Sequence, residues 1–361
     1  MKTIFPDTEN FKITEHNLFN EKVYLITPNK FKTEWNKENL IYRSSLWNMN
    51  FELISAGHKK FFNWNEKSDI YPEPLNLSDA KAICKIDGSL LICSKHKNNL
   101  IIRTRSTIDA TNMANGFEIK ILSEKYPQAF DNELINQENC SFLYEWVSPL
   151  NKIVLDYPEA DMYLIGVINH ADYTYHTQMA LNDLADRFKL KRPKTYTFDT
   201  IKNMLNTISE LKNEEGICLY YNNDQNIKKI KSIEYLKRHT FKSNCTYKTL
   251  LELWIEQKTP CFQSFKNYIE KYYDFECWGM SKTIIQNLYD NFDVIQNNIK
   301  EIGCFIEPLK NLSKKEGALK ILEVYNKTLY SGVAFTLLHN KEICAETIKK
   351  LMLEKQYPET I

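Results

Sequence analysis

The chain has 361 residues, and its 47 lysines and arginines nearly balance 46 acidic residues, which leaves a net charge of +1. A chain of this length can form two domains with a core each, and 43% hydrophobic with 26% charged residues is ordinary for a globular protein. The charge balance argues against a protein coated in positive potential that holds duplex nucleic acid.

Two further features bear on location. No apolar run approaches the length that spans a bilayer, and the segment from Met1 to Asp7 lacks the apolar core of a signal peptide. The nine cysteines are scattered and form no Cys-x-x-Cys pair, which argues against a zinc site or a disulfide framework. We therefore expect a protein of the reducing cytoplasm (the host cell's, if the source is a virus) with no membrane partner.

The first third of the chain contains an irregular part and a hairpin. Residues 1–80 are rich in aromatic side chains and show no regular pattern, so we expect them to be irregular. Two strand-like runs between residues 83 and 107 flank the polar residues 95–99, which predicts a hairpin. Arg103 and Arg105 alternate on its second strand, so we expect both side chains on one face.

The middle of the chain alternates between helical and strand-like patterns. Helices are predicted over residues 109–138 and 200–212, strands over 142–147 and 162–168, and a polar excursion over 170–198.

A second hairpin closes the mixed part of the chain. Its strands are predicted at 216–221 and 228–231, around a polar Asn-Asn-Asp turn. After about residue 241, apolar residues recur at helical spacing up to the C-terminal region, which predicts a helical domain.

The stretch Lys85-Ile86-Asp87-Gly88-Ser89 contains one of only nine glycines and places a lysine at the mouth of a strand. One chemistry that uses such a lysine is the covalent transfer of a nucleotide, in which the amine attacks the α-phosphorus of a nucleoside triphosphate. The amine attacks only when it is unprotonated, and a lysine has a pKa of about 10.4 in water. Nearby cations and burial lower that pKa, and the same cations neutralise a triphosphate. Carboxylates hold the metal ion that accompanies the triphosphate. This chemistry predicts one strand-borne lysine, at least two separate acids and several distant basic residues.

These residues occur in an order that resembles the phage-type RNA ligases of the T4 RNA ligase 1 family, within the covalent nucleotidyltransferase superfamily. The resemblance extends from about residue 42 to residue 240. Its motifs are Tyr42-Arg43-Ser44, Lys59-Lys60-Phe61-Phe62-Asn63, Lys85 to Ser89, Arg103 to Ser106, Tyr144 to Pro149, Asn151 to Tyr157, Glu215-Gly216, and Lys229-Ile230-Lys231 up to Tyr235.

The resemblance implies a role for each matching residue. Lys85 would be the nucleophile that forms lysyl-AMP, and Asp87 and Gly88 would shape the loop beneath the nucleotide. Lys229 and Lys231 would bind and activate the α-phosphate, with Lys228 as a rival that breaks the strand alternation.

The implied acids and phosphate contacts come from other motifs. Glu145 would contact the ribose or organise the metal site. Glu215 would help to bind the metal, with its neighbour Glu214 as a rival. Arg43 and Lys60 would contact the nucleotide phosphates.

The remaining assignments concern support and the second domain. Arg105 and Tyr235 would support the site or the RNA. In this family an acid early in the C-terminal domain also binds metal, which makes Glu256 a candidate. The family's upstream tyrosine has no match, although Trp35 and Phe31 lie near its position.

The resemblance implies an α+β fold: a nucleotidyltransferase (ATP-grasp-like ligase) domain of antiparallel sheets with flanking helices over residues 1–240, then an all-helical domain over 241–361 that selects RNA. The implied cofactors are ATP and Mg²⁺ or Mn²⁺. The implied partner is single-stranded or nicked RNA, with a broken tRNA anticodon loop as the family's suggestion, and we expect a monomer.

Three functions stay open at this point. The first is an ATP-dependent ligase that joins 5′-phosphate and 3′-hydroxyl RNA ends. The second is another covalent nucleotidyltransferase, such as a DNA ligase or a GTP-using capping enzyme, but these usually append a β-barrel domain rather than a helical one. The third is a non-catalytic RNA-binding protein on the same scaffold. The sequence has no Gly-rich Walker loop, so no kinase activity is expected.

Overall fold

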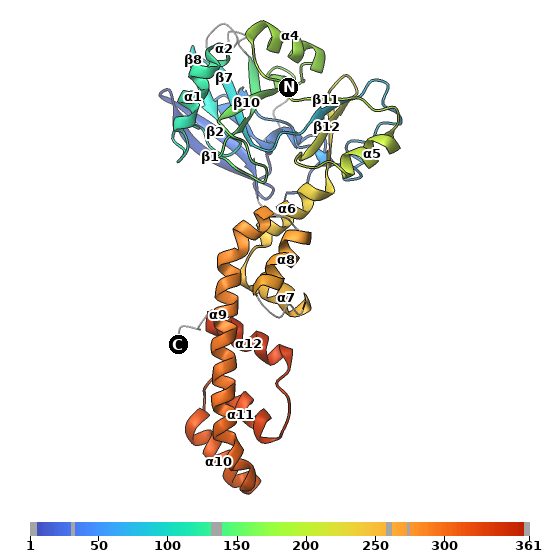
Figure 1. Ribbon diagram of the computed structural model, residues 1–361. Coiled ribbons are helices and arrows are strands. Elements are labelled where there is room, and N and C mark those ends of the chain that lie inside the picture. Colours follow the sequence, from blue (N-terminus) through green and yellow to red (C-terminus); the bar gives the residue numbers. More distant parts are fainter. Residues whose placement is uncertain (1–5, 30–32, 131–138, 258–261, 273–274, 357–361) are drawn as a thin grey trace. The chain divides into compact units, whose positions relative to one another are not determined.

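The computed structural model describes residues 6–29, 33–130, 139–257, 262–272 and 275–356. The chain divides into two compact units, Met1–Leu236 and Lys237–Ile361 (Figure 1). Helix α6 (Ile233–Asn244) contains the boundary between them. Within the described residues, no helix is long and apolar enough to cross a membrane.

An antiparallel N-terminal sheet occupies the region that was expected to be irregular, so that expectation is wrong. Its strands follow one another in the order β1-β2-β3-β4. The first turn has Phe19 and Asn20, both at positive φ, where Asn-Gly would be the usual signal. The sequence therefore lacks the usual turn signal for this hairpin. The strands are β1 (Phe11–Leu18), β2 (Glu21–Pro28), β3 (Ser45–Asn48) and β4 (Leu53–Ala56).

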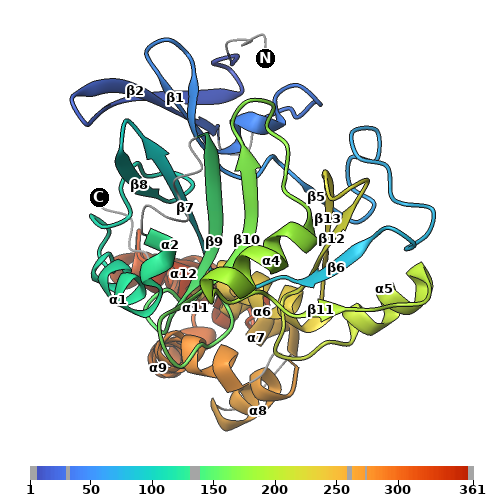
Figure 2. The ribbon, with the colours of Figure 1, turned by 90° about the horizontal axis from the view of Figure 1, so that it is seen from above.

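A central antiparallel sheet has the order β10-β9-β7-β8, and it confirms the first predicted hairpin and the two predicted strands after it. Figure 2 shows β9 and β10 side by side. Helices α1, α2 and α4 bury apolar side chains against one face of this sheet, in a cluster that includes Leu122, Phe142 and Leu181. The elements are β7 (Ser89–His96), β8 (Asn99–Arg103), β9 (Cys140–Val147), β10 (Asp161–Asn169), α1 (Phe117–Lys125), α2 (Pro127–Phe130) and α4 (Gln178–Phe188).

The helix predicted over 109–138 begins later than expected, at Phe117. The Asp109 carboxylate accepts hydrogen bonds from the backbone and side chain of Thr111 and from Asn112, and such local bonds compete with a helix. Residues 131–138 lie outside the described part. The predicted excursion at 170–198 contains α4 and a short strand, β11 (Thr195–Tyr196).

The third sheet has the order β11-β6-β12-β13-β5 and contains the second predicted hairpin. Helix α5 covers it through a cluster that includes Met204, Ile208 and Ile217. A separate core joins all three sheets, with Trp47, Leu143 and Tyr220 as members. The remaining elements are the 3-10 turn η1 (Leu40–Arg43), β5 (Phe62–Asn63), β6 (Lys81–Cys84), β12 (Gly216–Tyr221), β13 (Asn226–Lys231) and α5 (Ile201–Ser209).

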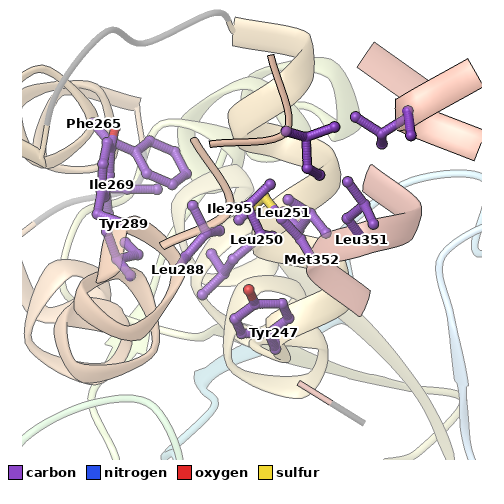
Figure 3. Packing of buried hydrophobic residues seen from close by; sticks show 14 of the residues in the cluster. Tyr247, Leu250, Leu251, Phe265, Ile269, Leu288, Tyr289, Ile295, Leu351 and Met352 are labelled. Atoms are coloured by element: carbon purple, nitrogen blue, oxygen red, sulfur yellow. The ribbon is translucent and has the colours of Figure 1, made fainter. Parts of the chain in front are cut away.

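The second unit is helical throughout its described residues, as the apolar spacing predicts. Its core joins α7, α8, α9 and α12, and Figure 3 shows Leu251, Leu288 and Met352 among the packed side chains. The expected α+β class, with a helical C-terminal region, is confirmed. The helices are α7 (Tyr247–Gln257), α8 (Phe262–Tyr272), α9 (Phe275–Ile306), η2 (Glu307–Asn311), α10 (Lys314–Tyr325), α11 (Ser331–Leu338) and α12 (Ala345–Gln356).

Candidate nucleotide-transfer site

The loop from Lys85 to Gly88 links β6 of the third sheet to β7 of the central sheet. The Lys85 backbone N–H donates to the Gly216 carbonyl at 2.8 Å. At Gly88, an added Cβ would lie 2.3 Å from the Trp146 carbonyl oxygen. Only glycine permits this close approach, so the loop backbone is held directly against β9.

Asp87 fastens the same loop to two other segments. Its side chain is buried, and Oδ2 accepts the backbone N–H groups of Val154 and Leu155 at 2.8 and 2.7 Å. Oδ1 accepts the Tyr235 hydroxyl at 2.7 Å. Burial, the Glu215 charge and this hydrogen bond raise the pKa of Tyr235, so the hydroxyl remains a donor. Three buried donors therefore depend on one carboxylate.

Glu215 lies between two lysines. Its Oε2 is 2.8 Å from Lys85 Nζ and its Oε1 is 2.9 Å from Lys231 Nζ, with only 2% of the carboxylate side chain exposed. The rival Glu214 lies elsewhere, where its carboxylate accepts the Tyr196 hydroxyl. The structure therefore brings together Lys85, Glu215 and Lys231.

The charge on Lys85 differs from the sequence expectation. Burial acts to lower its pKa, but the charges of Glu215 and then Glu145 outweigh burial and raise the pKa above its usual value. The expectation that neighbouring cations lower this pKa is wrong for this arrangement, because the sequence order does not reveal a direct ion pair. Lys85 is therefore protonated here.

Glu145 reaches the same site from β9. Its Oε1 accepts the Gly88 backbone N–H at 3.3 Å. Burial raises its pKa to about 7, against the lowering effect of Lys85 and with a raising effect of Glu215. The two acids and Lys85 thus form one electrostatically coupled group.

Alternation along β13 separates its lysines onto two faces. Lys229 is lined up with Cys218 and Lys231 with Gly216, so both lysines lie on the face that carries Lys85. Burial, then Lys60 and Lys231, lower the pKa of Lys229 to about 8. The rival Lys228 is fully buried on the other face, where it pairs with Glu73 at 2.8 Å.

Arg43, Lys60 and Lys229 extend the cationic surface. The Arg43 guanidinium and the Lys229 amine lie 5.0 and 5.8 Å from the centre of the Phe61 ring. Lys60 lies 5.7 Å from the Trp35 ring. Burial lowers the pKa of both Arg43 and Lys60, and each is lowered further by other arginines nearby. Phe31, which like Trp35 lies near the expected position of the family's upstream tyrosine, is outside the described residues.

The predicted alternation of Arg103 and Arg105 on one strand face is wrong, because β8 ends at Arg103. Arg103 is fully buried and donates to the hydroxyls of Ser44 and Ser55, each at 2.8 Å. Arg105 lies beyond the strand and is exposed, although its charge still lowers the pKa of Arg43.

Glu256 is an exposed residue of α7 in the second unit, and it is not among the residues that the first unit brings together.

Two residues beside Lys85 were not predicted. The charge of Lys85 acts on Cys218, two residues after Gly216, and on His58, two residues before Lys60. Their closeness to matched motifs was the signal that could have found them.

A family model described as RNA ligase matches residues 39–249. The chain belongs to this RNA ligase family. The match confirms the resemblance drawn from the motifs, and it covers the loop, both acids and both strand lysines of the site.

A curated relative is the putative bifunctional polynucleotide kinase/RNA ligase of Autographa californica nuclear polyhedrosis virus, 24% identical over 304 residues. That match covers 79% of this chain and 40% of the relative, so the chain spans about two fifths of its length.

Among solved structures, a mutant of the Naegleria gruberi RNA ligase with ATP and Mn is similar over 63% of this chain and 77% of its own, with 12% identity and a TM-score of 0.44. The same ligase with PPi is 14% identical over 45% of this chain and 52% of its own, with a TM-score of 0.39. At these TM-scores the likeness does not establish a shared fold.

Proposed function

We propose that this chain is an ATP-dependent RNA ligase that joins a 5′-phosphate to a 3′-hydroxyl. The observation that carries the proposal is the buried Glu215 carboxylate, held between Lys85 and Lys231 at 2.8 and 2.9 Å. Membership of the RNA ligase family supports it. Attack on a nucleoside triphosphate needs cations that neutralise the phosphates and acids that hold the accompanying metal ion.

The proposed reaction has three steps. The Lys85 amine, once deprotonated, attacks the α-phosphorus of ATP, the bond to pyrophosphate breaks, and lysyl-AMP forms. A 5′-phosphate oxygen of RNA then attacks that phosphorus, the P–N bond breaks, and Lys85 takes up a proton. In the last step the 3′-hydroxyl attacks the activated 5′-phosphate, loses its proton, and AMP leaves.

The side chains of the site have proposed parts in this sequence. Lys85 must leave its ion pair with Glu215 before it can act as a nucleophile, because the pair holds its proton. Lys229 and Lys231 bind the α-phosphate, and Arg43 and Lys60 bind the outer phosphates. Their positive charge stabilises the negative charge that develops in the transition state.

Mg²⁺ or Mn²⁺ is the proposed metal. The oxygens of Glu215 and Glu145 fit such an ion, since hard cations prefer carboxylate oxygen. No group of three or more His, Cys, Asp or Glu suited to a metal occurs in the described ranges, so phosphate and water oxygens would complete the ligand set. When bound, the ion supplies positive charge that offsets the triphosphate.

A labelling experiment tests the proposal. The protein is incubated with α-labelled ATP or GTP and Mg²⁺, and acid-stable label on the protein is measured. We expect label from ATP, none from GTP, and none on Lys85→Ala, which should still seal pre-adenylylated RNA. Label from GTP would indicate a capping-type enzyme, and a folded protein without label would indicate a non-catalytic RNA-binding protein.

The finer proposals concern substrate and setting. The substrate is single-stranded or nicked RNA, with a broken tRNA anticodon loop as the specific candidate, and the helical unit selects it. The enzyme acts as a monomer in the cytoplasm. Sealing rates of a nicked anticodon stem-loop and of a plain single strand, compared at equal concentration, test the substrate, and light scattering tests the oligomeric state.

A further inference from the structure

His58 is a buried histidine beside the nucleophile that the roles above leave unused. Only 4% of the residue is exposed. Burial, then the charges of Arg43 and Lys85, lower its pKa to about 3. The imidazole is therefore neutral at physiological pH, with one ring nitrogen that donates and one that accepts.

The surrounding hydrogen bonds assign the position of the ring proton. The Tyr175 hydroxyl accepts the Lys59 backbone N–H at 2.8 Å. Among the residues that the structure describes, the Tyr175 hydroxyl can donate its own proton to His58 Nδ1, 3.4 Å away. Nδ1 therefore accepts, and the proton lies on Nε2.

The Nε2–H group of His58 is a hydrogen-bond donor that lacks an acceptor among the described residues. The residue is only 4% exposed, and Nε2 would lie 3.7 Å from a Cβ added to Gly166, so the group faces a glycine that leaves it room. A nearly buried donor without an acceptor in a cationic site is suited to an anionic ligand.

Close packing fixes the ring in place. The ring centres of Phe61 and Tyr175 lie 5.7 and 5.5 Å from that of His58. On the β10 side, a Cβ added to Gly166 would come within 3.3 Å of His58 Cε1. Phe61 also lies 5.0 Å from the Arg43 guanidinium, so His58 belongs to the group proposed to hold the outer phosphates.

We propose that His58 Nε2–H donates a hydrogen bond to the β- and γ-phosphate part of the nucleotide, and to pyrophosphate when it leaves. This inference rests on the proposed function and adds a residue to it. Arg43 and Lys60 supply charge, whereas His58 supplies one donor of fixed direction. His58 is then a determinant of triphosphate over monophosphate binding.

Equilibrium binding tests this inference. In the Lys85→Ala background, nucleotides bind without reaction, and calorimetry gives Kd for ATP and for AMP with Mg²⁺ present. We expect His58→Met to weaken ATP about 10-fold to 100-fold, as for a lost hydrogen bond to a charged group, and to leave AMP unchanged. His58→Gln keeps an N–H donor and should lose less. Equal weakening of ATP and AMP would place His58 at the adenosine instead, and no weakening of either would also overturn the inference.

His170→Met is the matched control. His170 is also buried, and burial lowers its pKa to about 4, but its Nε2 is occupied by Ser141 Oγ at 2.7 Å. We expect this variant to leave the ATP-to-AMP affinity ratio unchanged. A similar fall in that ratio would show that any buried histidine has this effect.

A second measurement needs no variant to fold. In the native protein, saturating inorganic pyrophosphate should shift the NMR resonance of the His58 Nε2–H group, and an unchanged resonance would refute the contact. The proposed function fails separately, through absence of label from ATP on the native protein.

Discussion

Asp87 offers the sharpest test of how the loop is held. Asp87→Ala leaves the buried N–H groups of Val154 and Leu155 without an acceptor and removes the hydrogen bond of the Tyr235 hydroxyl. An unsatisfied buried donor costs about 1–3 kcal/mol, so the two N–H groups alone should cost the first unit roughly 2–6 kcal/mol of its free energy of unfolding. Asp87→Asn keeps an oxygen for both N–H groups and offers an amide to the Tyr235 hydroxyl oxygen. It loses only the assistance of the charge, about 1–2 kcal/mol.

The measurement must resolve the first unit by itself, because a chain with two compact units need not unfold in one transition. Hydrogen exchange followed by mass spectrometry gives the opening free energy of peptides from β9 and β12. Protection in these peptides should fall in the order native, Asp87→Asn, Asp87→Ala, while peptides from α9 stay unchanged. Equal losses for the two variants, or a loss below about 1 kcal/mol for Asp87→Ala, would refute the assignment of Asp87 as the shared acceptor.

Three further outcomes follow from the site. Gly88→Ala pushes a Cβ toward the Trp146 carbonyl oxygen, so the loop must move, and the rate of protein labelling by ATP should fall about 100-fold; a native rate would contradict the close approach. Lys229 loses its positive charge as pH rises through about 8, so ATP affinity should fall across that range, and Lys229→Arg should abolish this pH dependence because arginine stays charged. Lys228→Met removes the partner of Glu73 on the opposite face and should lower the melting temperature without changing the labelling rate per folded molecule. Loss of labelling in a folded variant would indicate that Lys228, rather than Lys229, acts on the α-phosphate.

The parts of the site that were predictable are those fixed by strand alternation. Lys229 and Lys231 differ by two positions, so a strand must place them on one face, and Gly216 next to Glu215 marks the start of the neighbouring strand. The glycine has φ of +139°, which L side chains rarely adopt. Local rules of this kind identified the two hairpins and placed their lysines and glycines.

What could not be predicted depends on contacts between distant segments. Arg103 and Arg105 differ by two positions just as the lysines do, but the strand ends between them, and five neutral oxygens enclose the Arg103 guanidinium instead. A strand end is set by pairing with its neighbour rather than by the residues themselves. The N-terminal sheet was missed because its first hairpin turns at Phe19 and Asn20 without the usual Asn-Gly signal, and because β3 and β4 have only four residues each.

The protonation state of Lys85 also depends on a contact between distant segments, its ion pair with Glu215. From composition alone, a lysine among cations should have a lowered pKa, and Lys229 does. Lys85 lies among the same cations, yet an acid 130 residues away in the sequence is its direct partner and raises its pKa. The pKa values of two lysines in one site thus shift in opposite directions, chiefly because Glu215 pairs directly with Lys85. If the pair holds Lys85 protonated, Glu215→Gln should lower the Lys85 pKa, and reaction of Lys85 with an amine-selective acylating reagent, read by peptide mass spectrometry, should extend to lower pH. An unchanged pH profile would mean that Glu215 does not control the proton of the nucleophile.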